Sequence, residues 1–523
     1  MPIRSPHPDV DVPAVRLSDY VLEGAAARGE RPAIVDAATG AVLSYARLAE
    51  DVDRCAAGFA ARGLAPGEVV GIFAPNVPEY AVAFHGVARA AGTNTTVNAL
   101  YTAEEAAFQL RIARARFLVT VPQMAARARA AARAAGVEEV FAIGEAAGTT
   151  PFHELLAPPG TPAPQPAIDP ETHVVALPFS SGTTGLSKGV MLTHRNLVAN
   201  LCQYAPVRVI GEDDRVIAIL PFFHIYGQTL VLNDALRRGA RIVTLPRFDL
   251  ALFLATIEEH GITACYVAPP VILALAKHPL VDDYDLSSLR FITSGAAPLD
   301  AELQGAAQRR VGCRVQQGYG LTEASPVTHH AHQDDENVHG TIGTLLPSTE
   351  ARLVDAETGV DAAPGEPGEI WVRGPQVMLG YLGDVAATAS TLTVDGWLRT
   401  GDIATIDEAG SFRVVDRLKE LIKYKGYQVP PAQLEGILLT HPQIADACVV
   451  PVRDEEAGEV PKAFVVPREG QSLDPCEVME FVAGRVAPHM QVRACELIDA
   501  IPKSPSGKLL RRVLVERERE ATR

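Results

Sequence analysis

Short apolar segments recur between residues 69 and 295 and alternate with longer, alanine-rich stretches of helical character. The apolar segments are candidate buried strands, namely VVGIFA (69–74), FLVTV (117–121), HVVALPF (173–179), RVIAIL (215–220), RIVTL (241–245), TACYVA (263–268) and LRFITSG (289–295). Candidate helices between them cover residues 45–63 and 123–136. This alternation predicts an α/β fold whose sheets are mainly parallel.

The pattern changes in the last third of the chain. From about residue 340, glycines punctuate strand-like segments such as GEIWVRGPQVMLGYL (368–382), which predicts a β-rich section. Near Asp416 begins a stretch that mixes helical QLEGILLTH (433–441) with strand-like ADACVVPV (445–452) and KAFVVP (462–467). We therefore expect a large N-terminal body of several subdomains, residues 1–416, and a small, mobile C-terminal α+β domain, residues 417–523.

Composition narrows the class of protein. The 523 residues are 47% apolar and 21% charged, as in ordinary globular proteins. The net charge of -16 argues against a nucleic-acid partner, because no basic stripe is available to neutralise phosphates. No segment approaches the ~18 apolar residues of a membrane span, and the polar N-terminus lacks a signal-peptide pattern, so we expect a cytoplasmic protein. Seven scattered cysteines without a C-x-x-C pair are expected to be buried free thiols.

The segment PFSSGTTGLSKGVMLTH (178–194) is a candidate phosphate-binding loop. It lies between a strand-like run and the helical segment 194–204, where backbone N–H groups favour anions. Its glycines allow a close approach of the backbone to a ligand. It differs from a Walker A loop because Gly189, rather than a hydroxyl residue, follows Lys188. A flexible surface turn rich in serine, threonine and glycine is the alternative interpretation.

The segment SSGTTGLSKGV (180–190) resembles the phosphate-loop signature of the adenylate-forming superfamily, which includes acyl-CoA synthetases, peptide-synthetase adenylation domains and firefly-type luciferases. Further motifs of that superfamily follow in order: GYGLTE (318–323), GWLRTGD (396–402), DRLKELIKYKGYQVPPAQLE (416–435) and PKSPSGK (502–508). The segment KELIKYKGYQV (419–429) is most similar to the 4-coumarate–CoA ligase branch. The resemblance implies that ATP, with Mg²⁺, activates a small carboxylic acid as an acyl-adenylate and that coenzyme A then takes the acyl group.

The resemblance also implies roles for individual residues. Lys508 would be the catalytic lysine of adenylation, with an ammonium that bridges the carboxylate and the α-phosphate. Glu323 would bind the metal ion, and Asp402 would accept the ribose hydroxyls with help from Arg417. The other ATP- and AMP-binding residues implied are Ser180, Ser181, Gly182, Thr183, Thr184, Lys188, Ala297, Gln317, Gly318, Tyr319, Thr322 and Lys419. Taken singly, such residues are more often surface charges, ion-pair members or packed aromatic rings.

Three lysines within LKELIKYKG would ordinarily indicate a solvated basic surface. By resemblance, Lys419 lies at a hinge about which the C-terminal domain rotates between the two half-reactions. Lys423 and Gln428 would then approach the adenylate as further catalytic residues. The coenzyme A site would comprise Lys425, Gly426 and Arg247.

The acyl pocket is expected along PFFHIYG (221–227), SGAAP (294–298) and SPV (325–327), with His224, Tyr226, Ala296, Pro326 and Val327 as substrate-binding residues. Small residues in SGAAP would leave a slot for a flat aromatic acid. Thr293 stands where plant-type members usually carry a lysine, so cinnamate is expected to serve as well as 4-coumarate. The main alternative is a medium- or long-chain fatty acyl-CoA synthetase. An adenylation module that loads a carrier protein, a luciferase-like oxygenase and a catalytically inactive binding protein are less consistent with the motifs.

Overall fold

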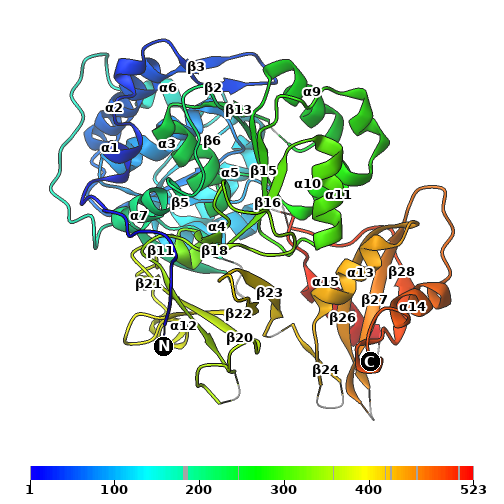
Figure 1. Ribbon diagram of the computed structural model, residues 1–523. Coiled ribbons are helices and arrows are strands. Elements are labelled where there is room, and N and C mark those ends of the chain that lie inside the picture. Colours follow the sequence, from blue (N-terminus) through cyan, green and yellow to red (C-terminus); the bar gives the residue numbers. More distant parts are fainter. Residues whose placement is uncertain are drawn as a thin grey trace.

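The computed structural model describes residues 2–180, 187–245, 247–356, 358–418, 420–424, 427–454, 457–504 and 507–521 (Figure 1). For Tyr427, Gln428 and Ala521 it describes the backbone alone. Within these residues the chain forms four sheets. The two largest sheets form the upper part of the molecule in Figure 1, and the other two lie below them.

The first large sheet is parallel in its centre and antiparallel at one edge. Its strands follow the order β10 (Phe179–Ser180), β11 (Lys188–Thr193), β9 (Val174–Ala176), β5 (Thr93–Thr96), β4 (Val69–Phe73), β6 (Ala115–Thr120), β7 (Glu139–Ala142) and β8 (Thr150–Pro151), with β21 (Gly380–Tyr381) beside β11. The antiparallel edge therefore brings residues 380–381 against the C-terminal half of the predicted phosphate-loop segment 178–194.

The second large sheet has the same plan, with five parallel pairings in its centre and antiparallel hairpins at both edges. Its order is β18 (Thr344–Leu345), β17 (Val327–His330), β16 (Arg314–Gly320), β15 (Phe291–Ser294), β14 (Ala264–Val267), β12 (Arg215–Ala218), β13 (Arg241–Thr244), β2 (Pro32–Asp36) and β3 (Val42–Ser44). Each of the seven apolar runs contains a strand of one of these two sheets, which confirms the α/β prediction.

Helices cover these sheets, and capping residues mark where two of the predicted helices begin or end. Ser44 accepts the backbone N–H of Arg47 at 3.3 Å and so caps the helix that covers most of the predicted segment 45–63. The second predicted helix ends at Gly136, whose φ of 79° favours glycine. The helical elements of this part are α1 (Leu17–Val21), η1 (Ala26–Arg28), α2 (Tyr45–Ala61), α3 (Pro78–Arg89), α4 (Ala103–Ala113), η2 (Pro122–Met124), α5 (Ala125–Ala135), α6 (Phe152–Leu155), α7 (His194–Tyr204), the π-helix η3 (Gly227–Asp234), α8 (Ala235–Arg238), α9 (Leu250–His260), α10 (Pro269–Lys277), η4 (Pro279–Asp283), α11 (Ala301–Val311) and η5 (Thr322–Ala324).

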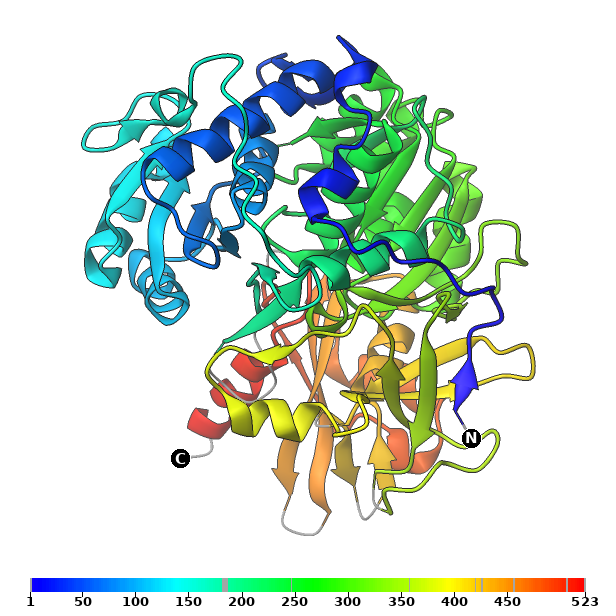
Figure 2. The same ribbon diagram turned by 90° about the vertical axis from the view of Figure 1, so that its left-hand side faces the viewer.

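The predicted β-rich section is an antiparallel sheet that the N-terminus completes. Its order is β1 (Ile3–Arg4), β19 (Glu350–Val354), β20 (Gly368–Arg373), β22 (Leu398–Ile406) and β23 (Phe412–Arg417), with α12 (Val385–Thr391) in the connection between β21 and β22. Strand β1 pairs with β19, so residues 3–4 and 350–351, far apart in sequence, lie side by side (Figure 2).

The described residues from Leu421 onward, here called the C-terminal unit, have their own sheet and their own apolar clusters. The sheet order is β25 (Tyr427–Val429), β24 (Ile422–Tyr424), β27 (Gly458–Pro467) and β26 (Ile444–Asp454), with β28 (Ala494–Leu497) beside β27; the helical elements are α13 (Pro431–Thr440), α14 (Pro475–Ala483), η6 (Pro488–Met490) and α15 (Arg511–Ala521). This is the predicted α+β composition. The domain boundary at residue 416 and the mobility of this unit stay predictions.

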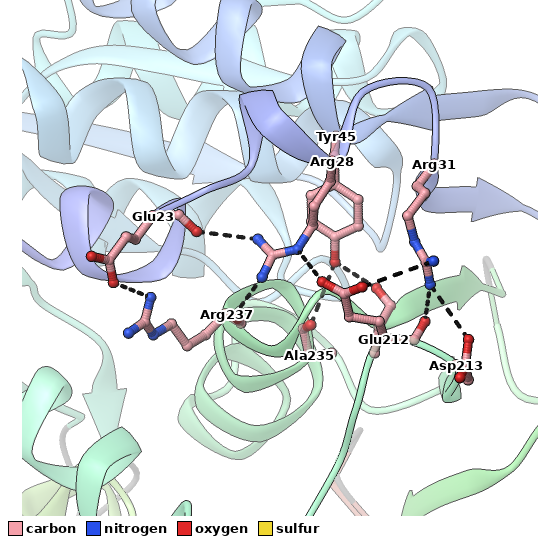
Figure 3. Close-up of polar contacts among 9 residues, drawn as sticks. Glu23, Arg28, Arg31, Tyr45, Glu212, Asp213, Ala235 and Arg237 are labelled. Atoms are coloured by element: carbon pink, nitrogen blue, oxygen red, sulfur yellow. Dashed lines mark hydrogen bonds and ion pairs between the residues drawn. The ribbon is translucent and has the colours of Figure 1, made fainter.

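Polar contacts join the helices near the N-terminus to α8 and to the loops that precede β12 and β13 (Figure 3). Arg28 Nε lies 3.1 Å from a carboxylate oxygen of Glu212, and Arg237 donates to Glu23 at 2.5 Å. The hydroxyl of Tyr45 donates to the carbonyl of Ala240 at 2.6 Å. Since the ion pairs are largely exposed, each contributes little to stability, and we assign the cluster a structural role.

All seven cysteines are free, and five of them are buried as predicted. Cys476 is exposed and Cys495 is partly exposed, so the prediction of burial is wrong for these two residues. Among the described helices, none is long and apolar enough to cross a membrane.

Candidate active site

Three of the predicted nucleotide-binding residues meet where β16, β22 and β23 end or bend. The Tyr319 hydroxyl donates to Asp402 Oδ2 at 2.5 Å, and Arg417 Nε lies 3.1 Å from Asp402 Oδ1. Asp402 and Arg417 are also backbone partners across β22 and β23. With only 5% of its surface exposed, the Asp402 carboxylate is held in one orientation by these two donors. A vicinal diol could therefore meet a preoriented carboxylate here.

A second group of contacts surrounds Glu323, which lies in η5 just after β16. Ser180 Oγ donates to Glu323 Oε1 at 3.0 Å, and the hydroxyl of Tyr381 donates to the same oxygen at 2.9 Å. Lys188 Nζ lies 5.0 Å from the centre of the Tyr381 ring, within range of a cation–π interaction. The structure thus links the base of the predicted phosphate loop to the predicted metal-binding carboxylate.

Tyr381 was not among the residues predicted from the sequence. It reaches Glu323 only because β21 pairs with β11, at the register Val190 to Tyr381. Burial and the negative charge of Glu323 raise the pKa of Tyr381, so the phenol stays protonated and keeps donating to the carboxylate. No spacing in the sequence marks this contact, since it depends on a strand pairing between positions almost 200 apart.

Glu323 provides one carboxylate, and the described part of the chain contains no group of three or more His, Cys, Asp or Glu side chains that could hold a metal ion. Magnesium in phosphate-transferring sites commonly takes one or two protein carboxylates and completes its shell with phosphate oxygens and water. The surroundings of Glu323 fit such an ion when it arrives with a nucleotide.

Lys508 lies on a short closed loop of the C-terminal unit. Two hydrogen bonds join Ser504 and Lys508: the Ser504 N–H donates to the Lys508 carbonyl at 2.8 Å, and the Lys508 N–H donates to the Ser504 side-chain Oγ at 3.1 Å. Gly507 has a φ of 81°, and a Cβ there would lie 2.9 Å from Cβ of Ala268. Glycine at this position lets the loop press against the start of α10.

The side chain of Lys508 lies among the nucleotide-site residues. Burial, together with the positive charge of Arg417, lowers the pKa of Lys508 from 10.5 to about 8, while the carboxylates of Glu420, Asp402 and Glu323 act in the opposite direction. One ammonium is therefore held within reach of two groups of predicted site residues. Glu420 was not predicted from the sequence as a site residue.

This lowered pKa predicts an alkaline limit on activity. Because the ammonium form is lost as pH rises, kcat/KM for ATP in acid-dependent ATP–pyrophosphate exchange should fall as pH rises through about 8. Lys508→Arg keeps a charge that does not titrate in this range, so its residual activity should decline only at higher pH. The measurement is the pH profile of both proteins, and superimposable alkaline limbs would contradict the assignment.

The predicted acyl-pocket residues lie beside Lys508. Burial and the charge of Lys508 lower the pKa of His224 to about 4, so its imidazole is neutral near pH 7. Its Nδ1 accepts the backbone N–H of Tyr226 at 3.3 Å, and the Tyr226 hydroxyl donates to the carbonyl of Thr293 at 3.1 Å. A Cβ on Gly295 would lie 2.9 Å from the Tyr226 ring, so glycine allows this ring to pack on the SGAAP segment.

The remaining predicted wall residues border the same region. Ala296 is exposed and has a φ of 72°, and Ala297 follows it at the surface of the site. Pro326 and Val327 are buried next to the GYGLTE segment, where a Cβ on Gly320 would lie 2.1 Å from the Pro326 carbonyl oxygen. Backbone contact thus explains this glycine of the motif.

The side-chain amide of Gln317, which we expected to face the nucleotide, is bonded to protein groups instead. Its Oε1 accepts the N–H of Leu299 at 3.0 Å, and its Nε2 donates to the carbonyl of Leu299 at 3.0 Å and to Gln304 at 3.1 Å. With its amide occupied in this way, a contact of Gln317 with a nucleotide would have to come from its backbone. Gly318 and Thr322 are partly exposed on either side of the Tyr319 turn, as a contact with nucleotide requires.

The helix predicted over residues 194–204 is α7, but the strand β11 lies within the segment predicted as the phosphate loop, so the loop assignment of residues 188–193 was wrong. Ser180 and Lys188 are backbone partners in the antiparallel pair β10–β11, and α7 begins only at His194. Val190 and Met191 pair with β21, and Leu192 and Thr193 pair with β9. This run of apolar and β-branched residues is a strand signal that the glycine-rich composition obscured. Thr193 Oγ1 accepts the N–H of Asn196 at 3.1 Å, and Asn196 Oδ1 accepts the N–H of Thr193 at 2.9 Å, so a capping box closes the start of α7.

Several predicted residues lie outside the described part of the chain, namely Ser181, Gly182, Thr183, Thr184, Lys419, Lys425 and Gly426. Gln428 is described by its backbone only, on β25 opposite Lys423. Lys423 is exposed on β24, which Figure 1 places at the outer end of the C-terminal unit, and its N–H donates to Glu459 at 2.8 Å. Arg247 is exposed beyond β13. The structure thus gathers the residues predicted for adenylation and leaves Lys423 apart from them.

Comparison with known proteins agrees with this geometry. Residues 22–382 match the AMP-binding enzyme family, and residues 433–508 match the AMP-binding enzyme C-terminal domain. The chain belongs to the AMP-binding enzyme family. This AMP-binding enzyme is 42% identical over 521 residues to 4-coumarate–CoA ligase 5 of Oryza sativa subsp. japonica, an alignment that covers 98% of this chain and 96% of that one.

Solved structures of similar proteins cover the whole fold. The ATP-bound structure of MatB from Rhodopseudomonas palustris matches this AMP-binding enzyme with a TM-score of 0.87 at 28% identity, over 97% of this chain and 100% of that chain. The apo structure of MatB matches with a TM-score of 0.76 at 28% identity, over 98% and 100%. The anthranilate CoA ligase AuaEII in complex with anthranoyl-AMP matches with a TM-score of 0.89 at 25% identity, over 97% and 98%.

Proposed function

We propose that the protein is an ATP-dependent acid–CoA ligase that adenylates a cinnamic-type acid and transfers the acyl group to coenzyme A. The observation that carries the proposal is the buried ammonium of Lys508, on which the charges of Arg417, Asp402 and Glu323 act and whose loop packs against the start of α10. Full-length similarity to 4-coumarate–CoA ligases at 42% identity supports this reaction and this class of acid.

In the first half-reaction a carboxylate oxygen of the acid attacks the α-phosphorus of ATP, and the bond to pyrophosphate breaks. The attacking and attacked groups are both anionic, so fixed positive charge dominates the lowering of the barrier. The ammonium of Lys508 bridges the acid and the α-phosphate, and Glu323 binds the magnesium ion that accompanies ATP. Asp402 and Arg417 hold the ribose, and Tyr319 offers a face to the adenine.

In the second half-reaction the sulfur of coenzyme A attacks the acyl carbon, AMP leaves and the thiol proton is released. Lys425, Gly426 and Arg247 are proposed to bind coenzyme A, while Lys423 and Gln428 approach the adenylate. Because Lys423 is exposed on β24 in the described arrangement, this step requires the C-terminal unit to turn.

The acyl site supports a flat acid without a required ring hydroxyl. Tyr226 packs its ring against Gly295, which gives the site one aromatic wall. Thr293, at the position of the plant-type lysine, is buried, and its hydroxyl lies 3.3 Å from His330 Nε2. A residue engaged in this way places no charge near the ring, so cinnamate and 4-coumarate should both be accepted.

A panel of acids tests the proposal directly. Pyrophosphate release would be measured with ATP, magnesium and coenzyme A against cinnamate, 4-coumarate, caffeate, benzoate, octanoate and palmitate. We expect cinnamate and 4-coumarate to give the highest rates and to accumulate as CoA thioesters. Turnover of the fatty acids alone would identify a fatty acyl-CoA synthetase and refute the substrate assignment.

The coenzyme A assignment has its own test. Lys425→Ala should lower kcat/KM for coenzyme A by roughly tenfold, the loss expected for one hydrogen bond to a charged group. Acid-dependent ATP–pyrophosphate exchange should change by less than about twofold, because that reaction does not involve coenzyme A. A larger loss in the exchange reaction than in thioester formation would overturn the role of Lys425.

A further inference from the structure

Helix α13 is one of the elements through which the C-terminal unit contacts the rest of the chain. Figure 1 shows it beside α10 and α11, and the contacts agree: a Cβ on Gly436 of α13 would lie 3.5 Å from Oδ2 of Asp300, the residue that caps α11. The helix also packs on β23. Both of its ends are occupied by residues from outside the C-terminal unit.

At the N-terminal end of α13 the capping group comes from another element, β23. Pro430 occupies the capping position and has no side-chain acceptor. Asp416 Oδ2, on β23, accepts the N–H of Ala432 at 2.9 Å instead. Asp416 is 3% exposed, and burial raises its pKa to about 6, so it carries its charge at neutral pH. A negative charge at this end of a helix is favourable because it opposes the helix dipole.

At the C-terminal end of α13 a cation from α10 contacts the last turn. All residues of α13 are described, and its last turn contains no basic residue. Lys277, the last residue of α10, donates from Nζ to the carbonyl of Leu439, one of the four carbonyls that a helix end leaves without partners. Burial and the charge of Arg468 lower the pKa of Lys277, and Glu302 opposes them. Taking an ammonium out of water is costly unless such an acceptor compensates.

The position of α13 is transmitted to the catalytic loop by one ion pair. Glu435 lies in the middle of α13, and its Oε1 is 3.1 Å from Nε of Arg511, which lies three residues after Lys508. The two side chains make a second contact between Arg511 Nη2 and Glu435 Oε2. Such a two-point contact fixes orientation as well as distance. Lys508 is therefore connected through Arg511 and Glu435 to the helix that Asp416 and Lys277 hold.

We propose that Asp416 and Lys277 clamp helix α13 at its two ends and thereby position Lys508 for acyl-adenylate formation. The inference rests on the proposed function for the identity of the half-reactions. Lys277 and Asp416 are positioning residues, since they act through α13 rather than on the substrates. The larger TM-score with ATP-bound MatB, 0.87 against 0.76 for apo MatB, agrees with an arrangement suited to the ATP-dependent step.

Lys277→Met tests the clamp. It should lower acid-dependent ATP–pyrophosphate exchange by roughly five- to tenfold, because one charge-assisted hydrogen bond no longer favours the competent arrangement. Thioester formation from a supplied acyl-adenylate should change by less than about twofold, since Lys508 is not needed there. Lys277→Arg keeps a donor and should restore most of the exchange activity. Asp416→Asn, at the other end of α13, should show the same selective loss.

Lys462→Met is the matched control. Lys462 is also a partly buried lysine, but it pairs with Glu496 and Glu518 inside the C-terminal unit. Its loss should leave the ratio of the two half-reactions unchanged. A second readout is the rate of tryptic cleavage in the connecting segment 417–425, which is rich in lysine and arginine. Lys277→Met should accelerate cleavage there selectively, whereas general instability would accelerate it throughout the chain.

The outcomes separate cleanly. A selective loss of exchange in Lys277→Met and Asp416→Asn, with rescue by arginine at position 277, supports the clamp. An unchanged ratio of exchange to thioester formation, whether both activities are retained or both fall equally, overturns the clamp. The assays use whichever acid the wild-type protein activates; if it activates none, the proposed function fails and tryptic cleavage of the connecting segment alone decides the clamp.

Discussion

Replacement of Lys508 by alanine is expected to abolish acyl-adenylate formation while leaving the second half-reaction largely intact. The ammonium is the positive charge that the C-terminal unit brings among Asp402, Arg417 and Glu323, and it would face charge that develops at the α-phosphate. Removal of one such preorganised group costs about 10²- to 10³-fold in rate. The measurement is acid-dependent ATP–pyrophosphate exchange beside thioester formation from a supplied acyl-adenylate.

Two comparisons make this result specific. Lys462→Ala removes a lysine of the same C-terminal unit whose partners are structural, and it should not change the ratio of the half-reactions. Lys508→Arg should retain part of the exchange activity because the charge is kept while its shape is altered. If Lys508→Ala lost both half-reactions equally, the lysine would be structural and its assigned role in adenylation would be wrong.

The second large effect is expected for Glu323→Gln. The substitution keeps size and hydrogen-bonding capacity but removes the negative charge proposed to bind the magnesium ion of ATP. We expect adenylation to fall by about 10²-fold, the loss for removal of one preorganised group in the site, and the magnesium requirement to rise. The measurement is the exchange rate as a function of magnesium concentration at fixed ATP.

Tyr381→Phe is the matched control for Glu323. It removes one hydrogen bond, 2.9 Å long, to the same carboxylate oxygen and leaves the carboxylate in place. The loss should stay below about tenfold, the value of one hydrogen bond to a charged group. An unchanged magnesium dependence in Glu323→Gln, or a larger effect in Tyr381→Phe, would remove the metal-binding role from Glu323.

The sequence allowed the parallel sheets to be predicted because each central strand is buried on both faces and therefore reads as a short apolar run. Runs such as 215–220 and 241–245 contain β12 and β13, which pair in register. The edges were harder to predict, since antiparallel edge strands mix polar and apolar residues. For this reason residues 188–193, which form β11, were wrongly assigned to a loop before α7.

Residues of the candidate site could be predicted only where they belong to a short, continuous sequence motif. Asp402 and Lys508 stand in short motifs, and the structure brings them together. Tyr381 and Glu420 could not be found in this way, because strand pairing and the placement of the C-terminal unit bring them to the site. Gln317 shows the opposite error: a polar residue inside a motif uses its amide to hold Leu299 rather than being left free for a ligand.

We conclude that this AMP-binding enzyme joins an aromatic, cinnamic-type acid to coenzyme A. A competition assay tests it most directly, with cinnamate, 4-coumarate, octanoate and palmitate present together at equal concentration with limiting ATP and coenzyme A. The ratio of thioesters formed equals the ratio of kcat/KM values. We expect cinnamoyl-CoA and 4-coumaroyl-CoA to dominate the mixture of thioesters in comparable amounts. A product mixture dominated by the fatty acyl thioesters, or adenylates that never become thioesters, would contradict it.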